Sequence, residues 1–198
     1  MRTTCRNRCL RLFAGTLLVL FVGLVGAYAF VHGAGNFHTV EQGVLYRSSC
    51  MGEAGLENAI VKHGVKSVLN LCGAQPGSPW YEGETTVARR HAVLFRDLAI
   101  SANQEPDPRQ LQAILDFLRD APRPMLIHCR AGSDRTGLAC AMFVMSRGGE
   151  YREASAQLGL YYGHFPYLGS KSISMDITLA RLYDQRSVRQ VAEGLALR

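Results

Sequence analysis

The segment that most constrains the fold is a short apolar run, a polar loop with a glycine, and a second apolar run in direct succession. Met125 to His128 fit a buried strand that ends at the histidine. Cys129 to Arg135 contain one glycine and four polar residues, and Thr136 to Ser146 have the composition of a buried helix. A strand, a tight loop and a helix in sequence form the repeating unit of a sheet covered by helices. The sequence therefore predicts an α/β architecture around this segment.

The rest of the folded part repeats this alternation, with glycine and proline residues between the elements. Extended segments are expected within Phe37 to Arg47, as two pieces around Gln42-Gly43, and at Val65 to Leu71 and Ala92 to Leu98. Helices are expected at Glu53 to His63, Trp80 to His91, Pro106 to the prolines at 122 and 124, Tyr151 to Tyr161 and Met175 to Leu197. This order predicts a single α/β domain with a central, mostly parallel sheet flanked by helices. Its ligand should bind at the carboxyl ends of the strands.

The N-terminal part has a different composition. Residues 1–11 hold four arginines, whereas residues 12–31 hold no charged residue. A helix of about 20 residues spans the hydrocarbon core of a bilayer, so residues 12–31 are expected to be a transmembrane anchor or a signal segment. The next basic residue is Arg47. This asymmetry predicts that the folded domain, residues 37–198, lies on the extracytoplasmic (periplasmic) side. Ala27-Tyr28-Ala29 also resembles a signal-peptidase site, so secretion after cleavage near Ala29 is the alternative.

The charges beyond the N-terminus are nearly balanced. Of 22 basic residues, four precede residue 12, which leaves 18 against 16 acidic residues. Nucleic acid is therefore not an expected partner, because its binding proteins carry a marked basic excess. The six cysteines form no CxxC pair and the histidines show no metal-ligand spacing. The sequence thus predicts neither a metal nor another cofactor.

Residues 129–135, called the phosphate loop below, carry groups suited to phosphate transfer. A turn from a strand into a helix directs successive backbone N–H groups inward, where they can hold an anion. Gly132 lets the backbone turn and approach the phosphate closely. Cys129 is the expected nucleophile, because positive surroundings favour the thiolate. The residues expected to bind phosphate are Arg130, Ala131, Gly132, Ser133, Asp134 and Arg135.

Residues beside the loop are expected to support it. Thr136 is placed to hydrogen-bond the sulfur and ease its departure, and His128 to orient the loop. The Asp134 carboxylate is expected to face out of the loop or to brace a neighbouring one. His164 is interpreted as an ordinary loop histidine, with a place in the lining of the pocket as the alternative, and His91 as a surface or core-filling residue.

The order His128-Cys129, five residues, Arg135-Thr136-Gly137 resembles the signature of the protein tyrosine and dual-specificity phosphatase superfamily. The segments Gly43 to Ser49 and Val68 to Leu71 resemble compact bacterial members, and the resemblance covers residues 37–161. It implies a phosphatase with a cysteinyl-phosphate intermediate and no metal.

The same resemblance implies an aspartic general acid at the end of a strand upstream of the nucleophile. Asp97 ends a predicted strand and lies 32 positions before Cys129, so it is the expected acid. Glu105 and Asp107 are competitors, although Asp107 also fits a helix cap.

The substrate follows less directly. Family analogy favours a phosphorylated protein, with phosphotyrosine first and phosphoserine or phosphothreonine beside it. The apolar N-terminal segment, and Ala131-Gly132 after a basic residue, favour a phosphoinositide or another phospholipid headgroup as the alternative. A phosphate-binding module without turnover and a sulfur-transfer enzyme are further alternatives.

Cys72 is a possible redox partner of the nucleophile. It follows a strand expected beside the strand that ends at Cys129, and neighbouring strands lie about 5 Å apart. We therefore hypothesise a reversible disulfide between Cys72 and Cys129 that protects the nucleophile from over-oxidation. A buried free thiol is the alternative interpretation of Cys72.

Overall fold

The computed structural model describes residues 13–23, 25–26 and 35–196, except for the side chains of residues 187–196. The chain divides into two units between residues 34 and 35, and each is described by itself. In the first unit, residues 13–23 are helical. No helix within the described ranges is long and apolar enough to cross a membrane. The expected segment 12–31 lies partly outside the described residues, so its membrane role stays a prediction.

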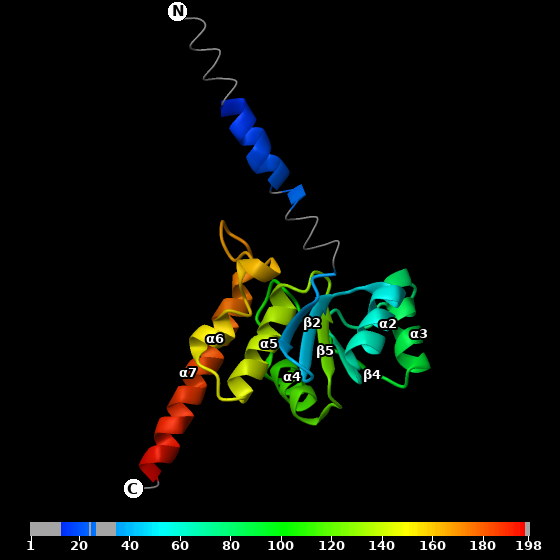
Figure 1. Cartoon of the computed structure of the whole chain (residues 1–198). Coiled ribbons are helices and arrows are strands. Elements are labelled where there is room, and N and C mark those ends of the chain that lie inside the picture. The colour runs from blue at the N-terminus through cyan, green and yellow to red at the C-terminus, as the bar shows by residue number, and fades with distance from the viewer. Residues whose placement is uncertain (1–12, 24, 27–34, 197–198) are drawn as a thin grey trace, which may run out of the picture. The chain divides into compact units, whose positions relative to one another are not determined.

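The second unit is built on a five-stranded sheet in the order β1-β2-β5-β3-β4. Only β1 is antiparallel to its neighbour, and the other pairs are parallel. The strands are β1 (His38–Glu41), β2 (Leu45–Ser49), β3 (Ser67–Asn70), β4 (Leu94–Asp97) and β5 (Met125–Cys129). The mostly parallel α/β sheet predicted from the sequence is therefore confirmed (Figure 1).

Helices cover both faces of the sheet, as Figure 1 shows. One face carries α2 (Gly52–His63) and α3 (Pro79–Arg90). The other carries α4 (Pro108–Asp120), α5 (Asp134–Ser146), α6 (Tyr151–Ser155) and α7 (Ile173–Ala196), with the short 3-10 helix η1 (Leu160–Tyr162) between α6 and α7.

Alternate residues of each strand serve the two cores, because strand side chains point to opposite faces in turn. In β5, Met125 and Ile127 belong to the larger core with α4, α5, α6 and α7, whereas Leu126 belongs to the core with α2 and α3. Both cores consist of residues after position 35. The sheet is thus buried on both sides, and its strand ends are fixed relative to one another.

Two helix predictions need correction. The single helix expected from Tyr151 to Tyr161 is wrong, because α6 ends at Ser155 and η1 follows separately. Gly159 is extended before η1 and Gly163 is left-handed after it, so these glycines interrupt the helix. The helix expected from Pro106 begins at Pro108, because the Asp107 side chain accepts from the Arg109 and Gln110 backbone N–H groups as its N-cap.

Candidate active site

The predicted phosphate loop leaves the sheet at the carboxyl end of β5. Cys129 is the last residue of that strand, pairs with Ser49 at the end of β2, and is 2% exposed. On its other side β5 pairs with β3, where Asn70 lies opposite His128. Helix α5 begins at Asp134, so the loop runs directly into a helix N-terminus as the sequence predicted. The backbone N–H groups of that first turn are free of intrahelical partners and suit an anion.

Gly132 allows the loop to press against β2. Its φ is +73°, a left-handed conformation, and a Cβ atom here would lie 2.6 Å from the carbonyl carbon and oxygen of Ser48. Side chains are excluded on both grounds. The close approach seen here is to the protein's own strand, and the expected approach of the Gly132 backbone to phosphate stays a prediction.

The Arg47 side chain, which comes from β2, binds the same part of the phosphate loop. It is fully buried, and its Nη2 donates to the carbonyls of Gly132 and Ser133 at 2.9 and 3.3 Å. Its Nη1 donates to the backbone and side-chain oxygens of Gln157, and its guanidinium lies 3.7 Å from the centroid of the Tyr162 ring. No carboxylate among the described residues forms an ion pair with it. Arg47 therefore brings a buried positive charge to the loop and engages its carbonyls.

Further contacts fix the first half of the loop. The Asn36 amide donates to the carbonyls of Ala131 and Tyr162 at 2.9 and 3.0 Å. The Arg130 side chain is exposed, but its backbone carbonyl accepts a hydrogen bond from the Cys50 thiol at 3.5 Å. The loop backbone is thus restrained at successive residues, which preorganises it.

Arg135 and Thr136 end the loop with buried polar atoms available for binding. Arg135 Nη1 donates to the carbonyls of Leu71 and Ile100 at 3.2 and 3.3 Å, which fixes the guanidinium. Its Nε and the Thr136 hydroxyl are buried without a hydrogen-bond partner among the described residues. Buried polar atoms in proteins are normally paired, so these two are suited to a bound anion and a thiolate.

His128 lies beneath the nucleophile beside a buried carboxyl group. Its Nε2 is 3.3 Å from Glu84 Oε2, and Glu84 Oε1 accepts from the backbone N–H groups of Met51 and Gly52. Burial, and then the Arg135 charge, lower the pKa of His128 to about 4. Burial raises the pKa of Glu84 to about 7. His128 is therefore neutral at physiological pH, and its predicted role in orienting the loop stays a prediction.

Asp97 ends β4 opposite Asn70, on the strand next to β3. Its carboxylate accepts from the Asn70 amide at 2.8 Å and from the Tyr81 hydroxyl at 2.7 Å. The competing acids are also engaged, since Glu105 pairs with Arg181 and Asp107 caps α4. Asp97 thus lies at the same edge of the sheet as Cys129, with both oxygens held, and its role as general acid stays a prediction.

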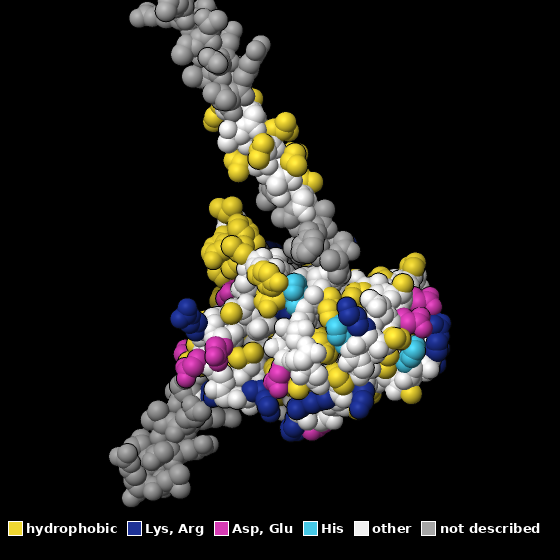
Figure 2. All heavy atoms as spheres, in the orientation of Figure 1, with side chains coloured by type: hydrophobic (Ala, Val, Ile, Leu, Met, Phe, Trp, Pro, Cys, Tyr) yellow, Lys and Arg dark blue, Asp and Glu magenta, His cyan; other side chains and the backbone are white. Residues whose placement is uncertain are grey.

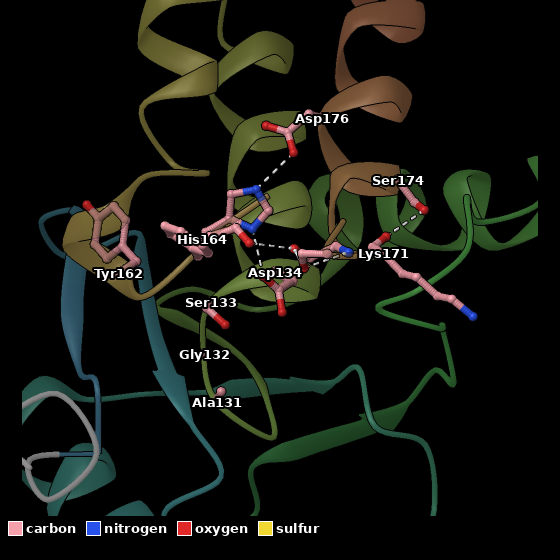
Figure 3. Close-up of polar contacts among 12 residues, drawn as sticks. Ala131, Gly132, Ser133, Asp134, Tyr162, His164, Lys171, Ser174 and Asp176 are labelled. Carbon is pink, nitrogen blue, oxygen red and sulfur yellow. Dashed lines mark hydrogen bonds and ion pairs between the residues drawn. The ribbon is translucent and has the colours of Figure 1, made fainter. Parts of the chain in front are cut away.

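His164 is not the ordinary loop histidine that the sequence suggested. It is fully buried, with Nδ1 at 2.6 Å from Asp134 and Nε2 at 2.9 Å from Asp176 of α7. Asp134 therefore braces a neighbouring segment, one of its two expected roles (Figure 3). His91 lies at the surface beside Glu57, as expected.

The described cysteines, including Cys72 and Cys129, are free thiols. Within the described residues no group of three or more His, Cys, Asp or Glu side chains could hold a metal ion. The redox pairing of Cys72 stays a hypothesis, although its sulfur contacts the residue next to the nucleophile.

Sequence reasoning missed Arg47, Asn36, Glu84 and Asp176. Arg47 left one signal: it lies in a segment expected to be extended, and an arginine that is buried in a sheet needs acceptors. For the other three the sequence offers no local signal, because their partners lie on other elements.

Comparisons with known proteins place this geometry in a family. A curated relative, "Inositol diphosphatase DSP1" of Oryza sativa subsp. japonica, is 32% identical over 107 residues, 52% of this chain and 46% of the relative. The chain thus spans about half the length of the curated relative it matches.

Solved structures with the same fold include the core catalytic domain of the PP-IP phosphatase SIW14 from S. cerevisiae, with a TM-score of 0.60, 18% identity and coverage of 81% of this chain and 93% of that chain. TpbA of P. aeruginosa has a TM-score of 0.55 at 19% identity, covering 73% of this chain and 85% of that chain. PTPMT1 has a TM-score of 0.61 at 12% identity, covering 79% and 99%. The model of the family described as "PTP-SAK: Swiss Army Knife protein, DSP-PTPase phosphatase domain" matches residues 35–192, and the chain belongs to this family.

Proposed function

We propose that this protein hydrolyses phosphate monoesters through a cysteinyl-phosphate intermediate. The observation that carries the proposal is the restrained loop from Cys129 to Arg135, which combines a nucleophile, a helix N-terminus and a fixed guanidinium. Arg47 adds a second positive charge beneath the loop. Such preorganised donors stabilise the charge that develops on the equatorial oxygens of a transferring phosphoryl group.

The proposed reaction has two steps. The Cys129 thiolate attacks phosphorus, the bond from phosphorus to the ester oxygen breaks, and Asp97 gives its proton to the leaving oxygen. Water then attacks the phosphocysteine, Asp97 takes a proton from it, and the bond from sulfur to phosphorus breaks to return the thiolate. The Thr136 hydroxyl, buried without a partner among the described residues, is suited to hydrogen-bond the departing sulfur.

The test is hydrolysis of a small aryl phosphate by the purified protein with chelator and reductant present. We expect turnover in wild type and none in Cys129→Ser, with inorganic phosphate still bound by the variant. Asp97→Asn should slow the release of poor leaving groups more than that of good ones. Cys140→Ala, which removes a buried thiol of α5 that lies outside residues 129–135, serves as the matched control. Phosphate binding without turnover in wild type would leave the binding-module alternative, and turnover retained in Cys129→Ser would refute the nucleophile.

For the substrate we propose a phosphorylated protein, with phosphotyrosine first. The family description supports it, and TpbA was solved in complex with pTyr as a cysteine-to-serine variant. The curated relative and SIW14 are described by their action on inositol diphosphates and PP-IP, so these compounds belong in the panel. Initial rates with phosphopeptides, inositol phosphates and phosphoinositides at equal concentration decide among the classes. A preference for any class other than phosphopeptides would contradict this choice.

A phospholipid headgroup is the second candidate, because exposed hydrophobic side chains border the phosphate loop. Leu168 is 95% and Tyr161 71% exposed, and Phe165 and Tyr167 lie between them in sequence. Figure 2 shows hydrophobic side chains gathered over the segment that follows α6, residues 160–168. This segment meets the phosphate loop through Asn36, whose amide donates to the carbonyls of both Tyr162 and Ala131. Exposed aromatic residues beside a site are typical of membrane interfaces.

If the substrate is a phospholipid headgroup, Leu168→Ser should reduce hydrolysis of a phosphoinositide in vesicles but not of a soluble aryl phosphate. Val61→Ser, which replaces another aliphatic side chain that is 72% exposed, on α2, is the control. Equal losses in both variants, or none, would remove this candidate.

The proposed location is the extracytoplasmic side of a membrane, attached through residues 12–31 or released after cleavage near Ala29. The charge asymmetry of the first 47 residues supports it. Fractionation of the producing cells, with N-terminal sequencing of the recovered protein, distinguishes the anchored from the cleaved form. Recovery in the cytoplasmic fraction would contradict both.

A further inference from the structure

A carboxylate within a loop that binds phosphate creates an electrostatic conflict. Asp134 immediately precedes Arg135, and its side chain is 25% exposed. Like charges repel more strongly in a partly buried site than in water. An uncompensated Asp134 would therefore oppose the binding of a phosphate dianion.

His164 meets this carboxylate from the segment that follows η1. Its buried imidazole lies between Asp134 at the start of α5 and Asp176 in the first turns of α7, as Figure 3 shows. Ionised carboxylates only accept hydrogen bonds, so both ring nitrogens donate and the ring is an imidazolium. Burial lowers the pKa of His164, but the hydrogen bonds to Asp134 and Asp176 outweigh burial and raise it.

Other charged groups near the imidazole are turned elsewhere. The Arg135 guanidinium donates to the carbonyls of Leu71 and Ile100, not to either carboxylate. The Lys171 side chain extends away from the ring in Figure 3. Among the described residues, the charges that face His164 are thus the two carboxylates, from α5 and α7.

We propose that His164 and Asp176 are positioning residues for phosphate binding: the His164 imidazolium neutralises the Asp134 carboxylate and holds it to one side of the phosphate loop, and Asp176 holds the imidazolium in place. This deepens the proposed function and rests on it, since it takes the loop to bind phosphate. Asp176 belongs to α7, so this helix takes part in holding the imidazolium.

The experiment measures the Kd of inorganic phosphate by calorimetry on the full chain, so that it requires no turnover. In His164→Gln, Asp134 keeps its charge but loses the imidazolium, and we expect roughly tenfold weaker phosphate binding. Asp176→Asn removes the second carboxylate and should give a smaller loss in the same direction. His91→Gln, which also removes a histidine beside a carboxylate, is the matched control and should bind phosphate as wild type does.

A second comparison separates this role from a merely structural one. In the Asp134→Asn background there is no loop carboxylate to neutralise, so His164→Gln should no longer weaken phosphate binding. A structural role predicts the same loss in both backgrounds, and that result would overturn the proposal. Thermal melts of all variants identify any that fail to fold, and only folded variants enter the comparison.

The pH dependence supplies a third readout. As pH rises through the raised pKa of His164, the imidazolium is lost and phosphate binding should weaken in wild type relative to Asp134→Asn. The comparison cancels the titration of phosphate itself. Identical pH profiles for the two proteins would contradict the proposal. A protein that binds phosphate with these dependences but hydrolyses nothing would instead contradict the proposed function alone.

Discussion

The phosphate loop is held on two sides by different chemistry. On the β2 side, the Arg47 guanidinium donates to loop carbonyls and Gly132 lies against the strand backbone. On the α7 side, His164 joins the Asp134 carboxylate to Asp176. A guanidinium stays charged at all accessible pH values, whereas an imidazole titrates near neutrality. The difference indicates that the sheet fixes the shape of the loop at every pH, and that the C-terminal segment sets its charge in a pH-dependent way.

Substitution of Gly132 should have the largest effect on activity, because an added side chain would collide with β2 and disrupt the contact between that strand and the phosphate loop. Gly132→Ala places a Cβ 2.6 Å from the Ser48 backbone and forces the loop off β2. Because displacement of a catalytic group by about 1 Å costs on the order of a hundredfold in rate, we expect a loss of about that size in Gly132→Ala. The rate of aryl phosphate hydrolysis measures this loss.

Gly43→Ala is the matched control for this substitution. Gly43 has nearly the same φ, +72°, but no atom within 4 Å of the added Cβ, so it carries the backbone strain without the collision. Equal losses of activity in the two variants would show that strain, not contact with β2, explains the effect.

Arg47→Met tests the contribution of the guanidinium that contacts the phosphate loop from β2. It keeps a long side chain but leaves the carbonyls of Gly132 and Ser133 and both oxygens of Gln157 without their donor. We expect a loss of about 3 kcal/mol in the free energy of unfolding, measured by urea denaturation. Phosphate binding should weaken by a similar factor at pH 6 and pH 9. A strongly pH-dependent factor would contradict the contrast with His164.

The α7 side should show its pH dependence in stability. Because the folded-state pKa of His164 is raised, its ion pairs stabilise the fold below the unfolded pKa near 6.5 and are lost as pH rises through the folded value. Wild type should exceed His164→Gln by about 2 kcal/mol at pH 6 and by less at pH 9 in urea unfolding. If the difference in the free energy of unfolding grew with pH, His164 would not be an imidazolium in the folded protein.

The smallest effect on activity is expected from substitution of Cys72, because this thiol brings no charge to the phosphate loop. Peroxide would oxidise the Cys129 thiolate to a sulfenic acid and release hydroxide; the Cys72 thiolate would then attack that sulfur and displace a second hydroxide to form the disulfide, which a dithiol reduces again. After peroxide, Cys72→Ser should regain a smaller fraction of its activity with reductant than wild type.

Cys50→Ser is the control for the redox experiment, since the Cys50 thiol donates to the carbonyl of Arg130, next to the nucleophile. Burial raises the pKa of both thiols, that of Cys50 to about 11, so the experiment and not the pKa distinguishes the two partners. If Cys50→Ser loses recovery and Cys72→Ser does not, the assignment of the redox partner is wrong.

The sequence alone determined the local unit and the family. The strand that ends at Cys129, the loop and the helix are contiguous, so hydrophobic pattern and glycine content were enough to predict them. The alternation of elements predicted the mostly parallel sheet in the same way. The helix expected from Tyr151 to Tyr161 failed because its composition suits a helix, while the two flanking glycines of η1 end it.

Only the tertiary structure decided what supports the loop. Arg47 precedes the carbonyls it binds by more than 80 residues, and His164 lies 30 residues beyond Asp134. A polar residue finds such partners through the pairing of strands and the packing of helices, and the local pattern does not encode those partners. A buried arginine or histidine therefore looks ordinary in the sequence until the fold places acceptors around it.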